Sequence, residues 1–278
     1  MTGQDLYRIR EFVPEFEAIS AETARRSRAL VERATIRRDI AYGNTPRAVL
    51  DLFFPENPAP GAPLHMFIHG GYWRSGEKAD HACVAEPVLA AGGIAAIVEY
   101  DLMPGTRLGT IISQIRQAAH WLVDNAASFG ADPARLTASG HSAGAHLASL
   151  LAATAPGEAP VHLAPINGLM MVSGIYDLSG IPGSFLKHEN RMTPDEARSF
   201  SPLSALHHPG PHRIIALGHE ETAPFHQQAL AFQTTLAAEG LPSELRLETG
   251  LNHMDVVLAL SDPGHPLGAR LQRLVSQA

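Results

Sequence analysis

ARLTASGHSAGAHLASLLAA, residues 134–153, holds the pattern that decides the fold. The apolar run at 134–139 predicts a strand, and 143–153 predicts a helix that starts almost directly after it. Between them lies Gly140-His141-Ser142-Ala143-Gly144, a Gly-x-Ser-x-Gly pentapeptide. The pentapeptide alone is a weak signal, and an ordinary Gly/Ser-rich turn is the alternative. Its place between a strand and a helix favours a nucleophile elbow, in which a strained turn presents Ser142 at the helix N-terminus.

Short β-rich runs alternate with longer helical runs on both sides of this stretch. Apolar strands separated by helices of this length predict a mostly parallel sheet of eight strands, with helices on both faces. In such a sheet the ligand site lies at the carboxyl ends of the strands. The strands are expected at 36–41, 47–54, 64–69, 93–100, 134–139, 167–174, 212–218 and 243–249, and the helices at 79–91, 107–128, 143–153, 223–239 and 254–260.

The chain is expected to form a single domain over residues 1–278, because no repeat and no linker divides it. A helical extension is predicted at about 1–34. The segment at about 178–210 is rich in Pro, Ser and His and interrupts the alternation of strands and helices. We interpret it as a small cap over the site.

A second glycine-containing loop, His69-Gly70-Gly71-Tyr72-Trp73, follows the strand at 64–69. Glycines let backbone amides approach a ligand closely, as the loop that completes an oxyanion hole must. Gly70, Gly71 and the amide of Ala143 are therefore the expected oxyanion donors, although an ordinary Gly-Gly turn is the alternative. The two aromatic residues either line a substrate pocket or pack the loop.

A serine nucleophile needs a base and an acid, which follow it in this order along the chain in folds of this kind: serine, acid, histidine. Two histidines, His253 and His265, lie beyond the strand at 243–249. His253 lies in the loop directly after this strand, so it is the expected base. The acid is expected in the loop after 212–218, where Glu220 and Glu221 stand side by side. Either carboxylate could orient an imidazole, and Asp255 is a weaker third candidate.

Composition excludes several classes of function. The net charge of −7 argues against nucleic acid as a partner, and a single cysteine, Cys83, excludes a disulfide framework or a Cys-based metal cage. The 15 histidines suggest a metal site, but His208 and His212 are separated by prolines, and no histidine completes a His-Glu-x-x-His motif after His219. No apolar run is long enough to span a membrane, and no secretory pattern opens the chain, so a cytoplasmic location without membrane partners is expected.

Five motifs together resemble the kynurenine formamidase (arylformamidase)-like branch of the α/β-hydrolase superfamily. They are HGGYW at 69–73, GHSAGAHL at 140–147, SGIYDL at 173–178, Ser-Pro-Leu at 201–203 and NHMDVV at 252–257. The resemblance implies an α/β-hydrolase fold, Ser142 as nucleophile, His253 as base, and an oxyanion site around Gly70, Gly71 and Ala143. It also implies an acid four residues before a phenylalanine, and Phe225 then points to Glu221. Eukaryotic members carry aspartate there, so glutamate is a departure.

The expected function is therefore that of a serine hydrolase without cofactor or metal, acting on a small molecule. The resemblance favours an aryl formamide such as N-formylkynurenine, with a general carboxylesterase for short-acyl or aryl esters as the alternative. Tyr72, Trp73 and Tyr176 are the candidate substrate-binding residues. A metal hydrolase and a catalytically silent ligand-binding fold are the other classes considered, and a homodimer is an open outcome.

Overall fold

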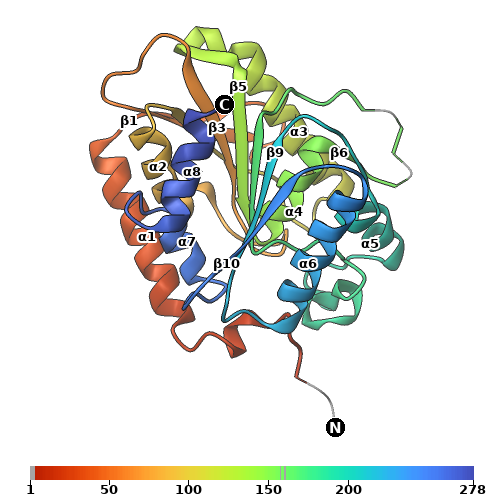
Figure 1. The fold of residues 1–278 in the computed structure, drawn as a ribbon. Coiled ribbons are helices and arrows are strands. Elements are labelled where there is room, and N and C mark those ends of the chain that lie inside the picture. The colour runs from red at the N-terminus through yellow and green to blue at the C-terminus, as the bar shows by residue number, and fades with distance from the viewer. Residues whose placement is uncertain (1–3, 157, 160) are drawn as a thin grey trace.

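In the computed structural model, which describes residues 4–156, 158–159 and 161–278, eight strands form one twisted sheet (Figure 1). β1 and β2 pair antiparallel, β2 pairs antiparallel with β4, and all the remaining pairs are parallel. The strands, in spatial order, are β1 (Thr35–Ala41), β2 (Val49–Phe54), β4 (Ile94–Val98), β3 (Ala62–Ile68), β5 (Ala131–His141), β7 (Gly168–Val172), β9 (His212–Gly218) and β10 (Ser243–Glu248).

The central strands are largely apolar on both sides because both faces of the sheet are covered. In β3, Met66 and Ile68 contribute to the core on one face, while Phe67 contributes to the core on the other. The same alternation occurs in β4, where Ala96 and Ile97 belong to opposite faces. Successive side chains of a strand point to opposite faces, so a sheet covered on both faces favours apolar residues at successive positions.

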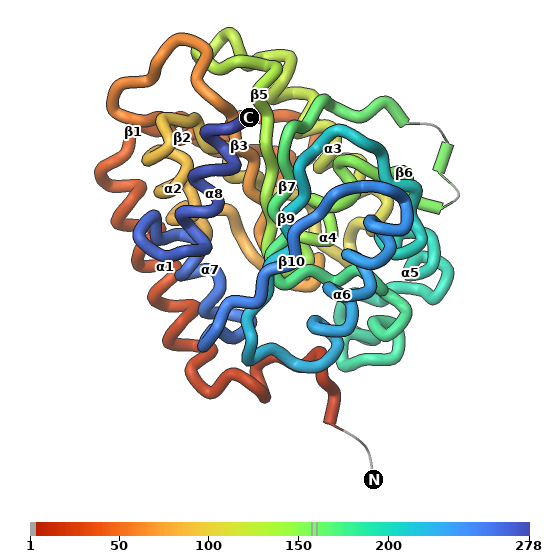
Figure 2. Tube along the Cα trace, viewed as in Figure 1, coloured from red at the N-terminus to blue at the C-terminus, as the bar shows by residue number. Residues whose placement is uncertain are grey.

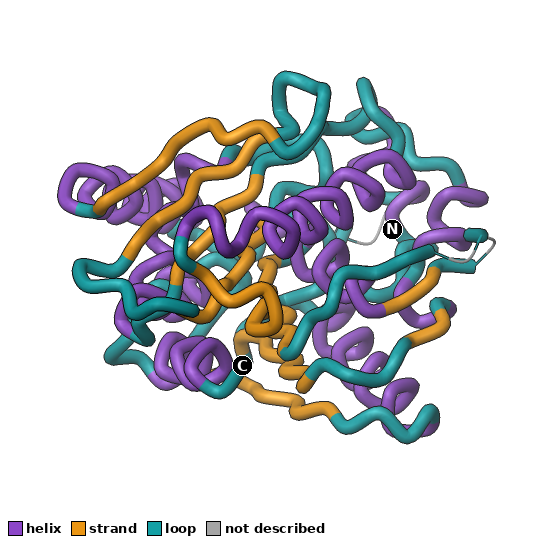
Figure 3. Tube along the Cα trace, turned by 90° about the horizontal axis from the view of Figure 1, so that it is seen from above, coloured by secondary structure: helices purple, strands orange, loops and turns teal. Residues whose placement is uncertain are grey.

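Two groups of helices supply these covers, and Figure 3 shows the strands between them. One group lies on the side of α8 in Figure 1: α1 (Phe16–Arg33), α2 (Ala85–Ala90), α7 (Asp255–Leu260) and α8 (Pro266–Ser276). The other group consists of α3 (Leu108–Asn125), α4 (Ala143–Ser149), α5 (Pro194–Phe200) and α6 (Ala223–Ala238). The predicted α/β-hydrolase fold with a mostly parallel sheet is confirmed.

The N-terminal strap, residues 5–13, runs past the carboxyl ends of the strands (Figure 2). It contains one 3-10 turn, Ile9–Glu11, and α1 follows it. Side chains from distant elements hold the strap: Tyr72 Oη donates to Tyr7 O at 2.5 Å, and Thr222 Oγ1 donates to Leu6 O at 2.8 Å. The predicted N-terminal helix therefore begins at Phe16, and the residues before it form part of the site edge.

The structure differs from the sequence prediction at two further places. The helix α8 was not predicted, although His265 accepts a hydrogen bond from the amide of Leu267 at 3.1 Å and Pro266 stands at the first helical position. The predicted helix at 79–91 begins as a 3-10 helix, Lys78–Val84, and only its second half is the α-helix α2. The segment expected to form the cap, 178–210, is a series of short elements. It consists of 3-10 turns at Ile181–Gly183, Phe185–His188 and Pro202–Ser204, helix α5, and the strand β8 (Leu206–His207), which pairs with β6 (Ala153–Thr154).

No helix in the described ranges is both long enough and apolar enough to cross a membrane. The division of the chain into one domain with a cap stays a prediction.

Candidate active site

The strand β5 ends in a sharp turn that places Ser142 at the start of α4. Ser142 has φ 55° and ψ −119°, a strained conformation for a residue with a side chain. The turn closes because its two flanking glycines carry no Cβ. A Cβ on Gly140 would lie 2.2 Å from Gly144 O, and one on Gly144 would lie 2.0 Å from Ile68 O. The Gly-x-Ser-x-Gly spacing is thus a packing requirement of the turn against β3.

A continuous chain of hydrogen bonds joins Ser142, His253 and Glu221. His253 Nε2 lies 3.1 Å from Ser142 Oγ, and His253 Nδ1 lies 2.7 Å from Glu221 Oε2. The three residues come from the carboxyl ends of different strands, because the parallel arrangement of β5, β9 and β10 brings those ends to one edge of the sheet. Ser142 and His253 are only 3% and 4% exposed, so their contact is shielded from bulk water.

Glu221 is fixed by bonds to both oxygens of its carboxylate. Its Oε1 accepts from Ser173 Oγ at 2.5 Å and from the Gly218 amide at 2.8 Å, which leaves Oε2 for His253. The side chain of Glu220, in contrast, is exposed, and only its backbone amide is described as bonded, to Leu251 O. Asp255 accepts from Asn252 at 2.5 Å. The structure therefore brings Glu221 to the histidine, and neither of the other two candidates.

His141, the residue before the serine, supports the position of His253. Its Nε2 lies 2.8 Å from His253 O, and the two rings are 4.9 Å apart. Burial, reinforced by the neighbouring His253, holds the pKa of His141 well below its usual value. A neutral His141 can thus donate to the His253 carbonyl and hold the backbone of that residue.

The loop after β3, residues 69–73, packs against the turn that holds Ser142. A Cβ on Gly70 would lie 3.2 Å from Ser142 Cβ, so this loop packs directly against the serine. Gly71 has φ 118°, and a Cβ there would lie 2.0 Å from Ser75 O, so the position requires glycine. Within the described residues, the amides of Gly71, Tyr72 and Ala143 have no hydrogen-bond partner. These N–H groups remain available to a bound anion.

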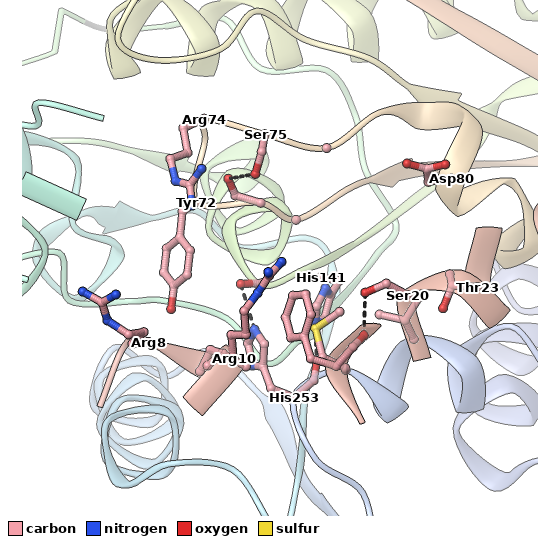
Figure 4. Close-up of a pocket in the computed structure, with 18 of the residues that line it drawn as sticks. Arg8, Arg10, Ser20, Thr23, Tyr72, Arg74, Ser75, Asp80, His141 and His253 are labelled. Atoms are coloured by element: carbon pink, nitrogen blue, oxygen red, sulfur yellow. Dashed lines mark hydrogen bonds between the residues drawn. The ribbon is translucent and has the colours of Figure 1, made fainter. Parts of the chain in front are cut away.

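A cavity of about 1020 Å³ opens above Ser142 and His253 (Figure 4). Part of its wall agrees with the sequence prediction: Tyr72 is a candidate substrate-binding residue, and Phe185 belongs to the segment at 178–210 that was expected to cover the site. The strap and α1 provide a further part of the wall, which was not predicted from the sequence. These residues are Arg8, Ile9, Arg10, Glu11, Phe16, Ser20, Thr23 and Ala24. No motif in the N-terminal sequence signals this role.

Two of the candidate substrate-binding residues lie in the core rather than in the cavity wall. Trp73 is 0% exposed, and its Nε1 donates to His146 Nδ1 at 3.1 Å. Tyr176 is also 0% exposed and stacks on Phe232 with ring centroids 4.3 Å apart. Neither side chain borders the cavity, whereas Tyr72 does. For Trp73, this placement corresponds to the alternative in which the aromatic residue packs the loop.

A mostly parallel sheet with a strained serine at the turn after its central strand defines the chain as an α/β-hydrolase. The BD-FAE family profile matches residues 50–236, and the chain belongs to this family.

Relatives of known name agree with the predicted branch. The chain is 26% identical to kynurenine formamidase of Danio rerio over 86% of this chain and 82% of the relative. It is 30% identical to isoprenylcysteine alpha-carbonyl methylesterase ICME of Arabidopsis thaliana, over 82% of this chain and 58% of that protein. The predicted similarity to the kynurenine formamidase-like branch and the predicted hydrolase class are confirmed.

Solved structures show the same fold. A protein from Silicibacter sp. TM1040, assigned provisionally to the thioesterases, superposes with a TM-score of 0.83 at 25% identity, with all of both chains covered. An esterase from Pyrobaculum calidifontis has a TM-score of 0.71 at 16% identity and covers 99% of this chain and 94% of its own. At this identity, the similarity to the Pyrobaculum calidifontis esterase concerns the fold alone.

Proposed function

We propose that this chain is a serine hydrolase in which Ser142, His253 and Glu221 act as nucleophile, base and acid. The observation that carries the proposal is the unbroken hydrogen-bond chain from Ser142 Oγ through His253 to Glu221 at the floor of the cavity. His253 Nε2 takes the proton of Ser142 Oγ as that oxygen attacks a carbonyl carbon, and later gives it to the leaving amine or alcohol. Glu221 orients the imidazole and stabilises its cation.

We assign the binding of the oxyanion of the tetrahedral intermediate to backbone amides of the loop at 70–72 and of the start of α4. Gly71 follows Gly70, which packs against Ser142, and Ala143 follows Ser142 in the chain. The amides of Gly71 and Ala143 are unpaired within the described residues. Amides fixed in a water-poor site need no reorientation when negative charge develops, and loss of one such donor costs about 10²- to 10³-fold in kcat. Gly70 belongs to the loop that presents the first of these donors.

For the substrate we propose an aryl formamide such as N-formylkynurenine. The support is the named relative kynurenine formamidase and a cavity of about 1020 Å³ with aromatic side chains in its wall, including Tyr72 and Phe185. An aryl group has room beside these rings, and a formyl group is the smallest acyl group that the serine can receive. We propose that the reaction needs neither metal nor cofactor.

A general carboxylesterase is the second candidate, favoured by the methylesterase relative. The two functions separate in a panel of N-formylkynurenine, N-acetyl analogues and p-nitrophenyl esters of increasing acyl length, compared by kcat/KM. A steep preference for formyl over acetyl supports the formamidase, and a preference for longer acyl chains overturns it in favour of the esterase.

The mechanism is tested in the same panel with Ser142→Ala, a variant expected to fold normally and to lose activity by at least about 10³-fold on every substrate. Retention of wild-type rates on both esters and formamides by this variant excludes Ser142 as the nucleophile. Exhaustive chelation is expected to leave the wild-type rate unchanged, and a loss that added divalent metal restores contradicts the metal-free mechanism.

A further inference from the structure

His69, at the first position of the loop at 69–73, is a buried histidine that the triad does not use. It is 0% exposed. Its Nε2 lies 2.9 Å from Glu99 Oε1, and its Nδ1 lies 2.7 Å from Gly70 O. The ring stacks on Tyr100 with centroids 4.4 Å apart, and the Tyr100 hydroxyl donates to His69 O at 2.8 Å. The imidazole therefore has a fixed position beneath the loop that adjoins Ser142.

Both ring nitrogens of His69 face acceptors. A carboxylate oxygen and a peptide carbonyl carry no proton to donate, so each bond requires an N–H on the ring. A neutral imidazole has one N–H and would direct a lone pair at the other oxygen. His146 shows the opposite arrangement: Trp73 donates to its Nδ1, and its Nε2 faces Phe200 O, which suits a neutral ring.

The charges around His69 balance when its ring is a cation. Glu99 also accepts from Arg47 at 2.6 Å and from the Lys78 amide at 3.0 Å. Lys78 Nζ in turn contacts the carboxylates of Asp39 and Asp51 at 2.8 and 2.7 Å. With His69 protonated, three cations face three carboxylates across this cluster.

The remaining titratable neighbour of His69 is His81, whose ring stacks at 5.7 Å. Burial, followed by repulsion from His69, lowers the pKa of His81 to about 4, so this ring is neutral at neutral pH. Burial opposes the ionisation of Glu99, but the hydrogen bond from His69 and the charges of His69 and Arg47 hold the pKa of Glu99 below its usual value.

We propose that His69 is a positioning residue with a proton on both ring nitrogens, and that this imidazolium polarises the peptide between Gly70 and Gly71. The Gly70 carbonyl that accepts from His69 Nδ1 belongs to the same peptide group as the Gly71 N–H. A cationic donor on that oxygen draws electron density from the peptide nitrogen and makes the N–H a stronger donor to an oxyanion. The catalytic effect of this charge rests on the proposed function, but the charge itself does not.

The charge is measured on the wild-type protein by long-range ¹⁵N–¹H correlation of its histidine rings. The His69 ring is identified by its proton contacts with the stacked ring of Tyr100, so no variant needs to fold. Two protonated nitrogens on this ring are expected at pH 7. A ring with one protonated nitrogen at pH 7 overturns the proposal.

The effect on the reaction is measured with His69→Asn and His69→Ala. The amide nitrogen of Asn occupies the place of Nδ1, so His69→Asn retains a donor toward Gly70 O but lacks the charge. We expect kcat for p-nitrophenyl acetate to fall about tenfold in His69→Asn and further in His69→Ala, with KM changed less than twofold. The half-buried His120, which does not line the cavity, provides the control His120→Asn, which is expected to retain wild-type kcat.

The outcomes separate the proposal from a purely structural role. Wild-type kcat in His69→Asn overturns the role of the charge and leaves only a spacer role for the ring. A wild-type protein that is inactive on the whole substrate panel overturns the proposed function, whereas the ring spectrum still decides the charge of His69.

Discussion

Two neighbouring glutamates follow β9, and only one of them has a carboxylate in the hydrogen-bond chain. Glu221→Gln keeps the size of the side chain and removes its charge, so it should disturb both the orientation of His253 and the stabilisation of its cation. By analogy with an Asp-to-Asn change in another Ser-His-Asp triad, we expect kcat to fall about 10³- to 10⁴-fold. The matched control Glu220→Gln is expected to stay within about twofold of wild type. A larger loss in the control than in Glu221→Gln contradicts the assignment.

At the residue scale, the sequence predicts the nucleophile and base well, because each is set by its place after a strand. The spacing left Glu220 and Glu221 open, and the resemblance, through Phe225, favoured Glu221. The side chain of Trp73 could not be placed from sequence. Tyr72 and Trp73 both have positive φ, 51° and 58°, and this unusual backbone sends one ring to the cavity and the other to the core.

At the scale of elements, the contact between α4 and β3 fixes the elbow. In Gly144→Ala the new methyl group would lie 2.0 Å from the Ile68 carbonyl oxygen, and neither backbone can move without displacing Ser142. We expect a loss of unfolding free energy greater than about 2 kcal/mol, measured by chemical denaturation.

Gly183 provides the control for this prediction. A Cβ at that position meets no atom within 4 Å, so Gly183→Ala is expected to change stability by less than about 0.5 kcal/mol. Equal stability of Gly144→Ala and wild type contradicts the packing argument.

Most regular elements were predicted with small errors at their ends, because covered strands and long amphipathic helices leave strong patterns. The helix predicted at 79–91 is an exception, because its first half is a 3-10 helix. Helix α8 was missed even though its buried residues Leu267, Leu271 and Leu274 recur at helical spacing. The strap was harder to predict. Its position depends on single hydrogen bonds from Tyr72, Thr222 and Gln228, which lie far away in the sequence and leave no local pattern.

At the scale of the whole molecule, the buried histidines make stability depend on pH. Burial lowers the pKa of His65 to about 3 and that of His146 to about 4, against 6.5 as the ordinary value. Between about pH 4 and 6.5 the unfolded chain binds protons at these positions and the folded chain does not. Stability should therefore decrease as pH falls through this window, by up to about 1.4 kcal/mol per pH unit for each histidine.

This dependence is measured by denaturant unfolding at several values between pH 7 and pH 4.5. His65→Gln removes one of these titrating groups. The slope of the unfolding free energy against pH should therefore decrease by the contribution of one histidine. His65 lies between the hydroxyls of Thr137 and Ser139, with which a glutamine amide can also form hydrogen bonds. A stability that stays constant over this range contradicts the argument.

The strap has a practical consequence for work with this protein. Residues 8–11 lie at the mouth of the cavity, whereas the carbonyl of Ala278 is held by Arg135 at 2.8 Å beside α8, at the opposite end of the molecule (Figure 1). An affinity tag, a fluorophore or a solid support attached at the α8 end leaves the path of the substrate clear. A label attached to the side chain of one of residues 8–11 would instead lie beside the cavity, and would alter the rates that the experiments above compare.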